Sequence, residues 1–139
     1  MSKTLYLLDT NAVSEAPKAQ PNPNVTAFFS GVPVESLYIS VLTFGELRKG
    51  VIVKRRTDPR TADDLAGWID RLEQTHGDRI LPIDHATATL WGKLSADRTR
   101  PVVDTLLAAT AIVHNLTLVT RNTRDVQDLP VRLHNPWLA

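Results

Sequence analysis

The sequence predicts one α/β domain, built from a short central parallel sheet with helices on both of its faces. Short apolar runs alternate along the chain with longer segments of helical periodicity, which is typical of parallel sheets with crossover helices. The length of 139 residues suits a single domain over residues 1–139, and neither a repeat nor a low-complexity segment divides it. The predicted strands are residues 4–8, 36–40, 79–83, 116–120 and 131–134.

The segments between these strands show the features of helices. In residues 61–76, apolar side chains recur at positions i, i+3, i+4 and i+7, the spacing of one helix face. This stripe consists of Leu65, Trp68, Ile69 and Leu72. We interpret it as core, or alternatively as a surface for dimerisation or for contact with a partner. The predicted helices are residues 9–15, 25–30, 41–54, 61–76, 84–97 and 103–114.

The composition excludes several classes of site. There are no cysteines, so disulfides and thiolate metal sites are ruled out. No apolar stretch approaches the roughly 18 residues needed to span a bilayer, and no signal pattern opens the chain, so we expect a cytoplasmic protein without membrane contact. The sequence contains no HExxH motif, no Walker lysine and no dinucleotide-binding glycine motif.

The charge is nearly balanced overall but uneven along the chain. The net charge is +1, yet residues 48–60 contain six basic side chains against the single acid Asp58. The basic residues of this stripe are Arg48, Lys49, Lys54, Arg55, Arg56 and Arg60. A basic stripe beside an acidic pocket suits a ligand with a phosphate backbone, although such runs are also common on solvated faces.

Four carboxylates from separated segments are predicted to meet at one edge of the sheet. Asp9, Glu46 and Asp125 follow the first, second and fourth predicted strands, and Asp104 opens an alanine-rich helix. The carboxyl ends of parallel strands share one edge, where ligands bind. Two unit charges about 4 Å apart cost about 4 kcal/mol at an effective dielectric near 20. Such a cluster therefore indicates a divalent cation with oxygen ligands, such as Mg²⁺.

Each of these acids also has a purely structural explanation. Asp9 can cap the helix that follows it, and Asp104 lies in a first helical turn, where its charge favours the helix dipole by about 0.3–1 kcal/mol. Thr43 and Glu46 have the spacing of a capping box, and Asp125 can stabilise a turn. The metal-site prediction therefore depends on all four acids lying together.

Two further acids are the nearest competitors for this role. Glu15 ends the first predicted helix, and Asp84 precedes the fifth. Asp84 stands before a helix rather than after a long strand, so helix capping explains it adequately.

Four ordered motifs resemble those of a known enzyme family. They are LDTNAVSE (residues 8–15), ISVLTFGEL (39–47), DTLLAATA (104–111) and LVTRNTRD (118–125), with NPW at 135–137. Over its whole length the sequence resembles the PIN-domain ribonuclease toxins of the VapC/FitB kind. The resemblance implies a PIN-like fold and a metal-dependent endoribonuclease that acts as the toxin of a type II toxin–antitoxin pair.

The resemblance also implies roles for individual residues. The catalytic residues that it implies, which also bind Mg²⁺ or Mn²⁺, are Asp9, Glu46, Asp104 and Asp125. The positions that support these acids or contact the substrate are Thr10, Asn11, Thr120 and Asn122, and we expect Arg121 and Arg124 to hold the substrate backbone.

The end of the last motif departs from the family pattern. The family usually has phenylalanine after its last acid, whereas this chain has Val126, with Asp128 close behind. The spacing after Thr120 and Asn122 favours Asp125 as the fourth acid, and Asp128 is the alternative.

The implied reaction is hydrolysis of an RNA phosphodiester bond to a 3′-hydroxyl and a 5′-phosphate. One or two cations held by the acids would orient a water and offset the charge that develops on the phosphate. Single-stranded loops are the usual targets of sequence-specific RNA recognition. The resemblance further implies a homodimer and a small cognate antitoxin whose C-terminal segment occupies the pocket, in a dimer of heterodimers or a larger complex.

Two other functions are compatible with acids at a strand end of an α/β fold. One is a non-catalytic PIN-like module that binds RNA or a protein partner. The other is a receiver-like signalling domain, which needs a phospho-accepting aspartate directly after a strand and a lysine after a later one. Here Asp58 lies in a predicted basic turn at residues 55–60, and Arg121 follows the fourth strand. These positions argue against the receiver.

Overall fold

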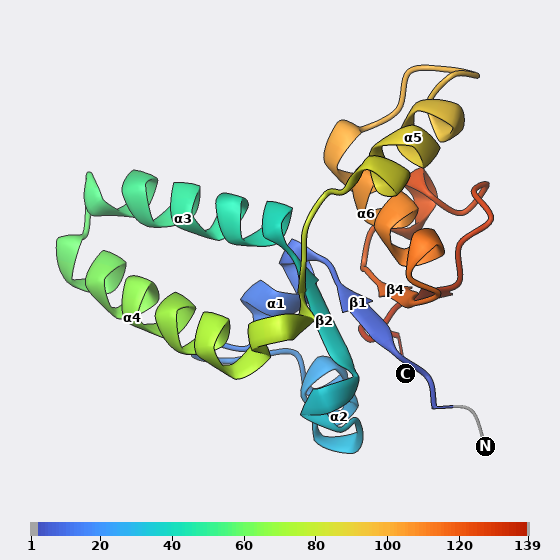
Figure 1. Cartoon of the computed structure of the whole chain (residues 1–139). Coiled ribbons are helices and arrows are strands. Elements are labelled where there is room, and N and C mark those ends of the chain that lie inside the picture. Colours follow the sequence, from blue (N-terminus) through green and yellow to red (C-terminus); the bar gives the residue numbers. More distant parts are fainter. Residues whose placement is uncertain (1–2, 139) are drawn as a thin grey trace.

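A parallel sheet runs through the middle of the molecule (Figure 1). The structure is a computed structural model and describes residues 3–138. The strand order is β3-β2-β1-β4-β5 and every pair is parallel, so the first strand of the chain is the central one. The strands are β1 (Tyr6–Leu8), β2 (Leu37–Ser40), β3 (Ile80–Leu81), β4 (Thr117–Val119) and β5 (Leu133–His134).

Helices pack on both faces of this sheet, which confirms the predicted fold class. One core cluster joins the sheet to α1, α3 and α4, and the other joins it mainly to α6. The helices are α1 (Thr10–Glu15), α2 (Pro23–Gly31), α3 (Val41–Arg55), α4 (Pro59–His76), α5 (His85–Leu94) and α6 (Val102–Val113). Short 3-10 turns are η1 (Val34–Ser36), η2 (Gly77–Arg79) and η3 (Thr123–Asp125).

Adjacent residues of the central strands enter opposite cores. Leu8 and Val119 belong to the cluster with α1, α3 and α4, whereas Leu7 and Leu118 belong to the cluster with α6. All four side chains are buried. Because successive side chains of a strand point to opposite faces, a sheet that is covered on both sides needs apolar residues at every position. This explains the continuous apolar runs in the sequence.

The start of α3 corrects one alternative reading of Glu46. Ser40 Oγ accepts the N–H of Leu42 at 3.1 Å, so α3 begins directly after β2. Thr43 and Glu46 both lie inside this helix, and the capping box considered for them is therefore wrong. The carboxylate of Glu46 is left to make other contacts.

Other boundaries differ from the predicted ones by a few residues. Asp58 caps α4 and Pro59 occupies its first turn, so part of the predicted basic turn is helical. Asp84 Oδ1 accepts the N–H of Thr87 at 2.8 Å, which confirms the predicted cap of α5. That helix ends at Leu94 rather than at residue 97. The strands are shorter than predicted, since they comprise only two to four residues each.

α3 and α4 form an antiparallel pair that extends away from the sheet (Figure 1). Arg48 on α3 binds Asp70 and Glu73 on α4 at 2.7 and 2.9 Å, and Arg55 binds Asp63 at 2.6 Å. Two members of the basic stripe therefore hold the helices together. Among the helices that the structure describes, none combines the length and the apolarity needed to cross a lipid bilayer.

The apolar stripe of α4 is part of the protein core. Ile69 is buried, and Leu65, Trp68 and Leu72 pack against the same core cluster. The structure therefore favours the core interpretation of this stripe over a free docking surface.

Candidate active site

Asp9 lies at the carboxyl end of the central strand, where β1 passes into α1. Its N–H donates to the carbonyl of Val119 at 3.0 Å, so pairing with β4 fixes its position. Its side chain caps α1 by accepting the N–H of Ala12 at 2.8 Å, which confirms the structural role considered for it. The residue is only 4% exposed, so its carboxylate has little freedom to turn away from this edge of the sheet.

Glu46 reaches the same edge from α3. The hydroxyl of Thr10 donates to Glu46 Oε1 and lies 3.2 Å from Thr43 Oγ1. Thr43 is fully buried between these helices, whereas Glu46 is exposed. The first turn of α1 therefore orients a carboxylate of α3.

Asn122 joins the remaining two acids. Its side-chain amide donates to Asp104 Oδ2 at 3.1 Å and to Asp125 Oδ2 at 2.6 Å. The backbone N–H of Asn122 donates to Thr120 Oγ1 at 3.0 Å, which fixes the turn after β4. One amide therefore holds an acid of α6 beside an acid of η3.

The environment of these acids opposes their ionisation. Burial raises the pKa of Asp9 above its ordinary value, hydrogen bonding by Thr120 opposes this shift, and the charges of Asp104 and Glu46 add to it. Burial likewise raises the pKa of Asp104, with further repulsion from Asp125 and Glu46. The acids are thus close enough to repel one another.

Three of the acids line one pocket of about 410 Å³, whereas Asp125 is not among the lining residues and is linked to the pocket acid Asp104 by the side-chain amide of Asn122. The lining residues are Asp9, Thr10, Asn11, Glu46, Pro101, Val102, Val103, Asp104 and Leu107. Within residues 3–138, no three His, Cys, Asp or Glu side chains lie close enough, as they stand, to hold a metal ion. The acids therefore share a pocket without forming a ready-made ligand set.

The donor chemistry of the pocket fits Mg²⁺ or Mn²⁺. Every side chain that could donate electrons to a cation there does so through carboxylate, hydroxyl or amide oxygens, which these hard ions prefer. Burial is the main cause of the raised pKa values of Asp9 and Asp104, and a bound cation would offset the repulsion that adds to it. Glu46 is exposed on its helix, and Thr10 holds its carboxylate in the lining of the same pocket as Asp9.

The other residues predicted for the site have differing positions. Thr120 is buried and hydrogen-bonds to Asp9, and Asn11 lines the pocket. Arg121 lies against the Trp137 ring, with 5.4 Å between its guanidinium carbon and the ring centroid. Arg124 is exposed on η3. Neither arginine is among the residues that line the acid pocket.

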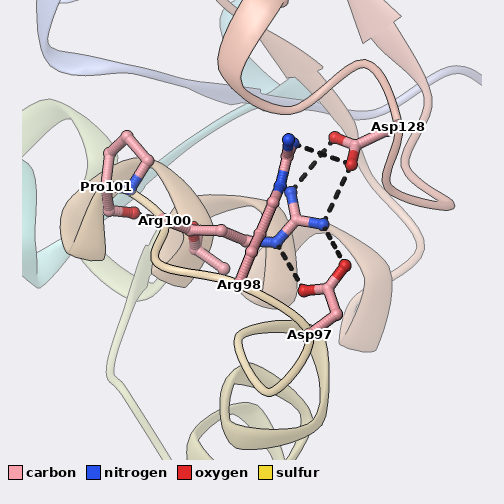
Figure 2. Close-up of polar contacts among 6 residues, drawn as sticks. Asp97, Arg98, Arg100, Pro101 and Asp128 are labelled. Carbon is pink, nitrogen blue, oxygen red and sulfur yellow. Dashed lines mark hydrogen bonds and ion pairs between the residues drawn. The ribbon is translucent and has the colours of Figure 1, made fainter.

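Asp128, the alternative fourth acid, is held by arginines (Figure 2). Arg100 donates to both of its carboxylate oxygens, at 2.9 and 3.1 Å, and Arg98 adds a bond of 2.9 Å. The hydrogen bonds from Arg100 lower the pKa of Asp128. Because Asp125 shares an amide with Asp104, the geometry favours Asp125 over Asp128 as a member of the acid group.

The two competing acids serve their own segments. Glu15 is buried and accepts the Lys18 ammonium and the N–H of Asn22, both at 2.8 Å. Asp84 caps α5. Neither residue lines the acid pocket.

Sequence reasoning missed several residues that shape the site. Ser40 and Thr43 position α3, and Val102 and Val103 form an apolar wall of the pocket. The spacing of Asp97 and Arg100 is a local signal for an ion pair at i and i+3. The bond between Arg100 and Asp128 has no such signal, since these residues lie 28 positions apart.

Comparison with known proteins agrees with this architecture. The PIN domain family matches residues 6–130. Toxin FitB of Neisseria gonorrhoeae is 32% identical, covering 96% of this chain and 99% of that protein. VapC ribonuclease Y4jK of Sinorhizobium fredii is 33% identical, covering 96% and 98%. The crystal structure of FitAcB from Neisseria gonorrhoeae matches with a TM-score of 0.89 at 30% identity, covering 97% of this chain and 100% of that one. The chain therefore belongs to the PIN domain family, and within it to the VapC/FitB kind.

Proposed function

We propose that this chain is a metal-dependent endoribonuclease and the toxin of a type II toxin–antitoxin pair. The observation that carries the proposal is the shared pocket of Asp9, Glu46 and Asp104, with Asp125 held beside Asp104 by Asn122. The names of two relatives, Toxin FitB and VapC ribonuclease Y4jK, support the same activity.

The four carboxylates are proposed to bind the metal ion in two ways, directly or through water. Asp9 and Asp104 would bind Mg²⁺ or Mn²⁺ directly, because they are the more buried acids of the pocket. Glu46 and Asp125 would bind through water or accept a proton. When bound, the cation activates the attacking water and offsets charge on the phosphate.

The chain's own side chains prepare the pocket for this reaction. Thr10 holds Glu46, and Asn122 holds the acids of α6 and η3 in place. The apolar residues Val102 and Val103 form one wall of the pocket. Orientation by fixed neighbours is a main source of catalytic rate, since misplacement of reacting groups by about 1 Å can cost 100-fold.

A second groove offers the RNA backbone a path away from the acids. Its volume is about 470 Å³, and it shares Glu46 with the acid pocket. It is lined by Glu46, Lys49, Gly50, Val53, Lys54 and Thr57. Within residues 3–138, Lys49 and Lys54 form no ion pair, in contrast to Arg48 and Arg55. We infer that these two lysines bind phosphates that flank the cleaved bond.

The proposed partners follow from the same assignment. RNA is the substrate, and a small cognate antitoxin would cover the acid pocket, in a complex built on a toxin homodimer. The solved structure of FitAB bound to an IR36 DNA fragment, which this chain matches with a TM-score of 0.88 at 29% identity, supports a partner protein. We place the reaction in the cytoplasm, because the proposed substrate, RNA, is available there.

Cleavage of RNA with added Mg²⁺ tests the proposal. Purified protein should cut a pool of structured RNAs, and a chelator should stop cleavage. Asp9→Asn and Asp104→Asn should each reduce the rate at least about 100-fold, since each removes a charged metal ligand. Asp84→Asn is the matched control, because Asp84 caps α5 and does not line the acid pocket. Equal rates for wild type and both pocket variants would overturn the assignment, and RNA binding without cleavage would favour the non-catalytic module.

A further inference from the structure

Arg100 lies between two aspartates (Figure 2), next to Pro101, which lines the acid pocket. Its side chain is 3% exposed, although its partners Asp97 and Asp128 are 62% and 44% exposed. It donates two hydrogen bonds to each carboxylate, at 3.2 and 2.9 Å to Asp97 and at 3.1 and 2.9 Å to Asp128. Paired bonds of this kind fix the guanidinium in orientation as well as in distance.

The backbone next to Arg100 begins the helix that bears Asp104. Pro101 is the N-terminal cap residue of α6, and no side chain caps this helix end. The carbonyl of Pro101 accepts the N–H of Thr105 at 3.1 Å and its hydroxyl at 2.7 Å. Fixing Arg100 therefore fixes the first turn of α6, and with it Asp104.

Asp128 is anchored on the opposite segment. Its neighbours Val126 and Leu129 are both buried in the core cluster that contains α6. Asp125, three positions before Asp128, ends the η3 turn. The bonds between Arg100 and Asp128 therefore join the segment of one site acid to the segment of another.

Repulsion between their acids favours separation of the start of α6 from η3. Asp104 and Asp125 have like charges, and apart from the bridging amide of Asn122 they repel each other. The attraction between Arg100 and Asp128 opposes this repulsion. We propose that Arg100, through Asp128, is a positioning residue that holds α6 against η3 and so keeps Asp104 beside Asp125. This inference rests on the proposed nuclease function, and it adds two residues to the machinery of the site.

Asp97 provides a matched control within the same cluster. Asp97 accepts the same number of bonds from Arg100 as Asp128 does, but it lies only three residues away on the same loop. Asp97→Asn removes a local bond, whereas Asp128→Asn removes the bond between segments. Asp128→Glu keeps the carboxylate and serves as the rescue variant.

Kinetics of RNA cleavage at saturating Mg²⁺ test the proposal. We expect Asp128→Asn to lower kcat about 10-fold while KM changes less than about 2-fold, because geometry rather than binding is lost. Asp97→Asn should remain within about 2-fold of wild type, and Asp128→Glu should recover most of the activity. Adding Arg100→Gln to Asp128→Asn should slow cleavage little further, because Asp128→Asn already disrupts the contacts of Asp128 with both Arg100 and Arg98. If the losses of the two single variants multiply in the double variant, Arg100 does not act through Asp128, and the proposal is overturned.

Hydrogen exchange provides a test that does not depend on catalysis. In metal-free protein, Asp128→Asn should speed exchange of the Thr105 and Val126 amides, which lie on the two sides of the bridge, relative to Asp97→Asn. If the wild type cuts no RNA, the proposed function is wrong, but hydrogen exchange still tests whether the Arg100–Asp128 contact holds the two segments together. Equal exchange and equal kcat in the two asparagine variants would show that Arg100 positions nothing in the site. A loss of kcat that merely follows thermal stability across the variants would overturn the proposal too.

Discussion

At Asp9, one carboxylate both caps a helix and faces the acid pocket. The cap needs only a side-chain oxygen, and asparagine provides one as well as aspartate does. The proposed metal site needs the charge. The two roles can therefore be separated by substitution.

We expect Asp9→Asn to remove activity and to stabilise the metal-free protein. The variant keeps the cap but removes the negative charge, which is disfavoured by burial and by repulsion and whose cost raises the pKa of Asp9. The free energy of unfolding should rise by about 1 kcal/mol at pH 7, the usual size of a single-residue effect. Asp9→Ala should instead lose about 1 kcal/mol relative to Asp9→Asn, because it also removes the cap. Urea denaturation of both variants measures these differences, and an Asp9→Asn protein less stable than wild type would contradict the argument.

The hydroxyl of Thr10 is expected to matter through Glu46. Thr10→Val keeps the shape of the side chain but removes the bond to Glu46. We expect kcat to fall about 10-fold, while Thr10→Ser, which keeps the hydroxyl, stays near wild type. Steady-state cleavage of one RNA substrate measures both. Similar rates for the valine and serine variants would show that Glu46 needs no such orientation.

At the scale of elements, the structure divides the basic stripe into two groups. Arg48 and Arg55 bind acids of α4, whereas Lys49 and Lys54 line the groove beside Glu46. The α4 partners of Arg48 and Arg55 lie between 8 and 25 residues away along the chain, so the sequence alone does not show which basic residues form ion pairs. Only the antiparallel packing of α3 on α4 separates the paired from the unpaired charges.

RNA binding by the groove predicts a particular dependence on salt. For an Asp104→Asn protein, which does not cut, the slope of log Kd against log salt should decrease by about 0.7 for each lysine replaced by glutamine at positions 49 and 54. Lys93→Gln is the control, because Lys93 lies on α5 and is absent from the lining of both the groove and the acid pocket. Equal slopes in all variants would exclude the groove as an RNA path, and loss of partner binding instead would assign it to a protein.

Most elements could be predicted from periodicity, while their ends depended on caps. The apolar stripe of α4 and the runs of β1 and β4 indicated their structures correctly, since each buries one face or both. The predicted start of α3 at residue 41 is correct, but Ser40 was not recognised as its cap, because Ser40 also ends the preceding strand. Asp9, Glu46 and Asp125 could be expected at one edge because each follows a predicted strand of a parallel sheet. The resemblance implied a supporting role for Thr10, but its contacts with Glu46 and Thr43, and the contact of Arg100 with Asp128, could not be predicted because they join separate elements.

At the scale of the whole molecule, the acids should make stability depend on pH. The raised pKa values of Asp9 and Asp104 mean that the folded protein binds more protons than the unfolded chain between the two sets of values. Stability therefore falls as pH rises from the unfolded pKa through the folded pKa. The other acids with shifted pKa values are stabilised as carboxylates and act in the opposite direction, so the comparison needs a matched variant.

We expect the double variant Asp9→Asn/Asp104→Asn to have a higher free energy of unfolding than the wild type. This advantage should grow as the pH rises from about 4 toward neutrality. Metal-free unfolding curves at each pH measure the difference. Saturating Mg²⁺ should then reduce this difference in unfolding free energy, because only the wild type has the intact site. A ligand at 100 times its Kd stabilises the folded state by about 2.7 kcal/mol. A difference that shrinks with rising pH would mean that the acids do not destabilise one another.

The central place of β1 has a consequence for synthesis on the ribosome. This strand emerges first, but one of its two neighbours is β4, so the sheet cannot close until residues 117–119 have been made. Asn122 and Asp125 follow β4 directly. A nascent or truncated chain that stops before this point therefore lacks the complete set of acids, so the proposed nuclease activity requires synthesis to continue through η3.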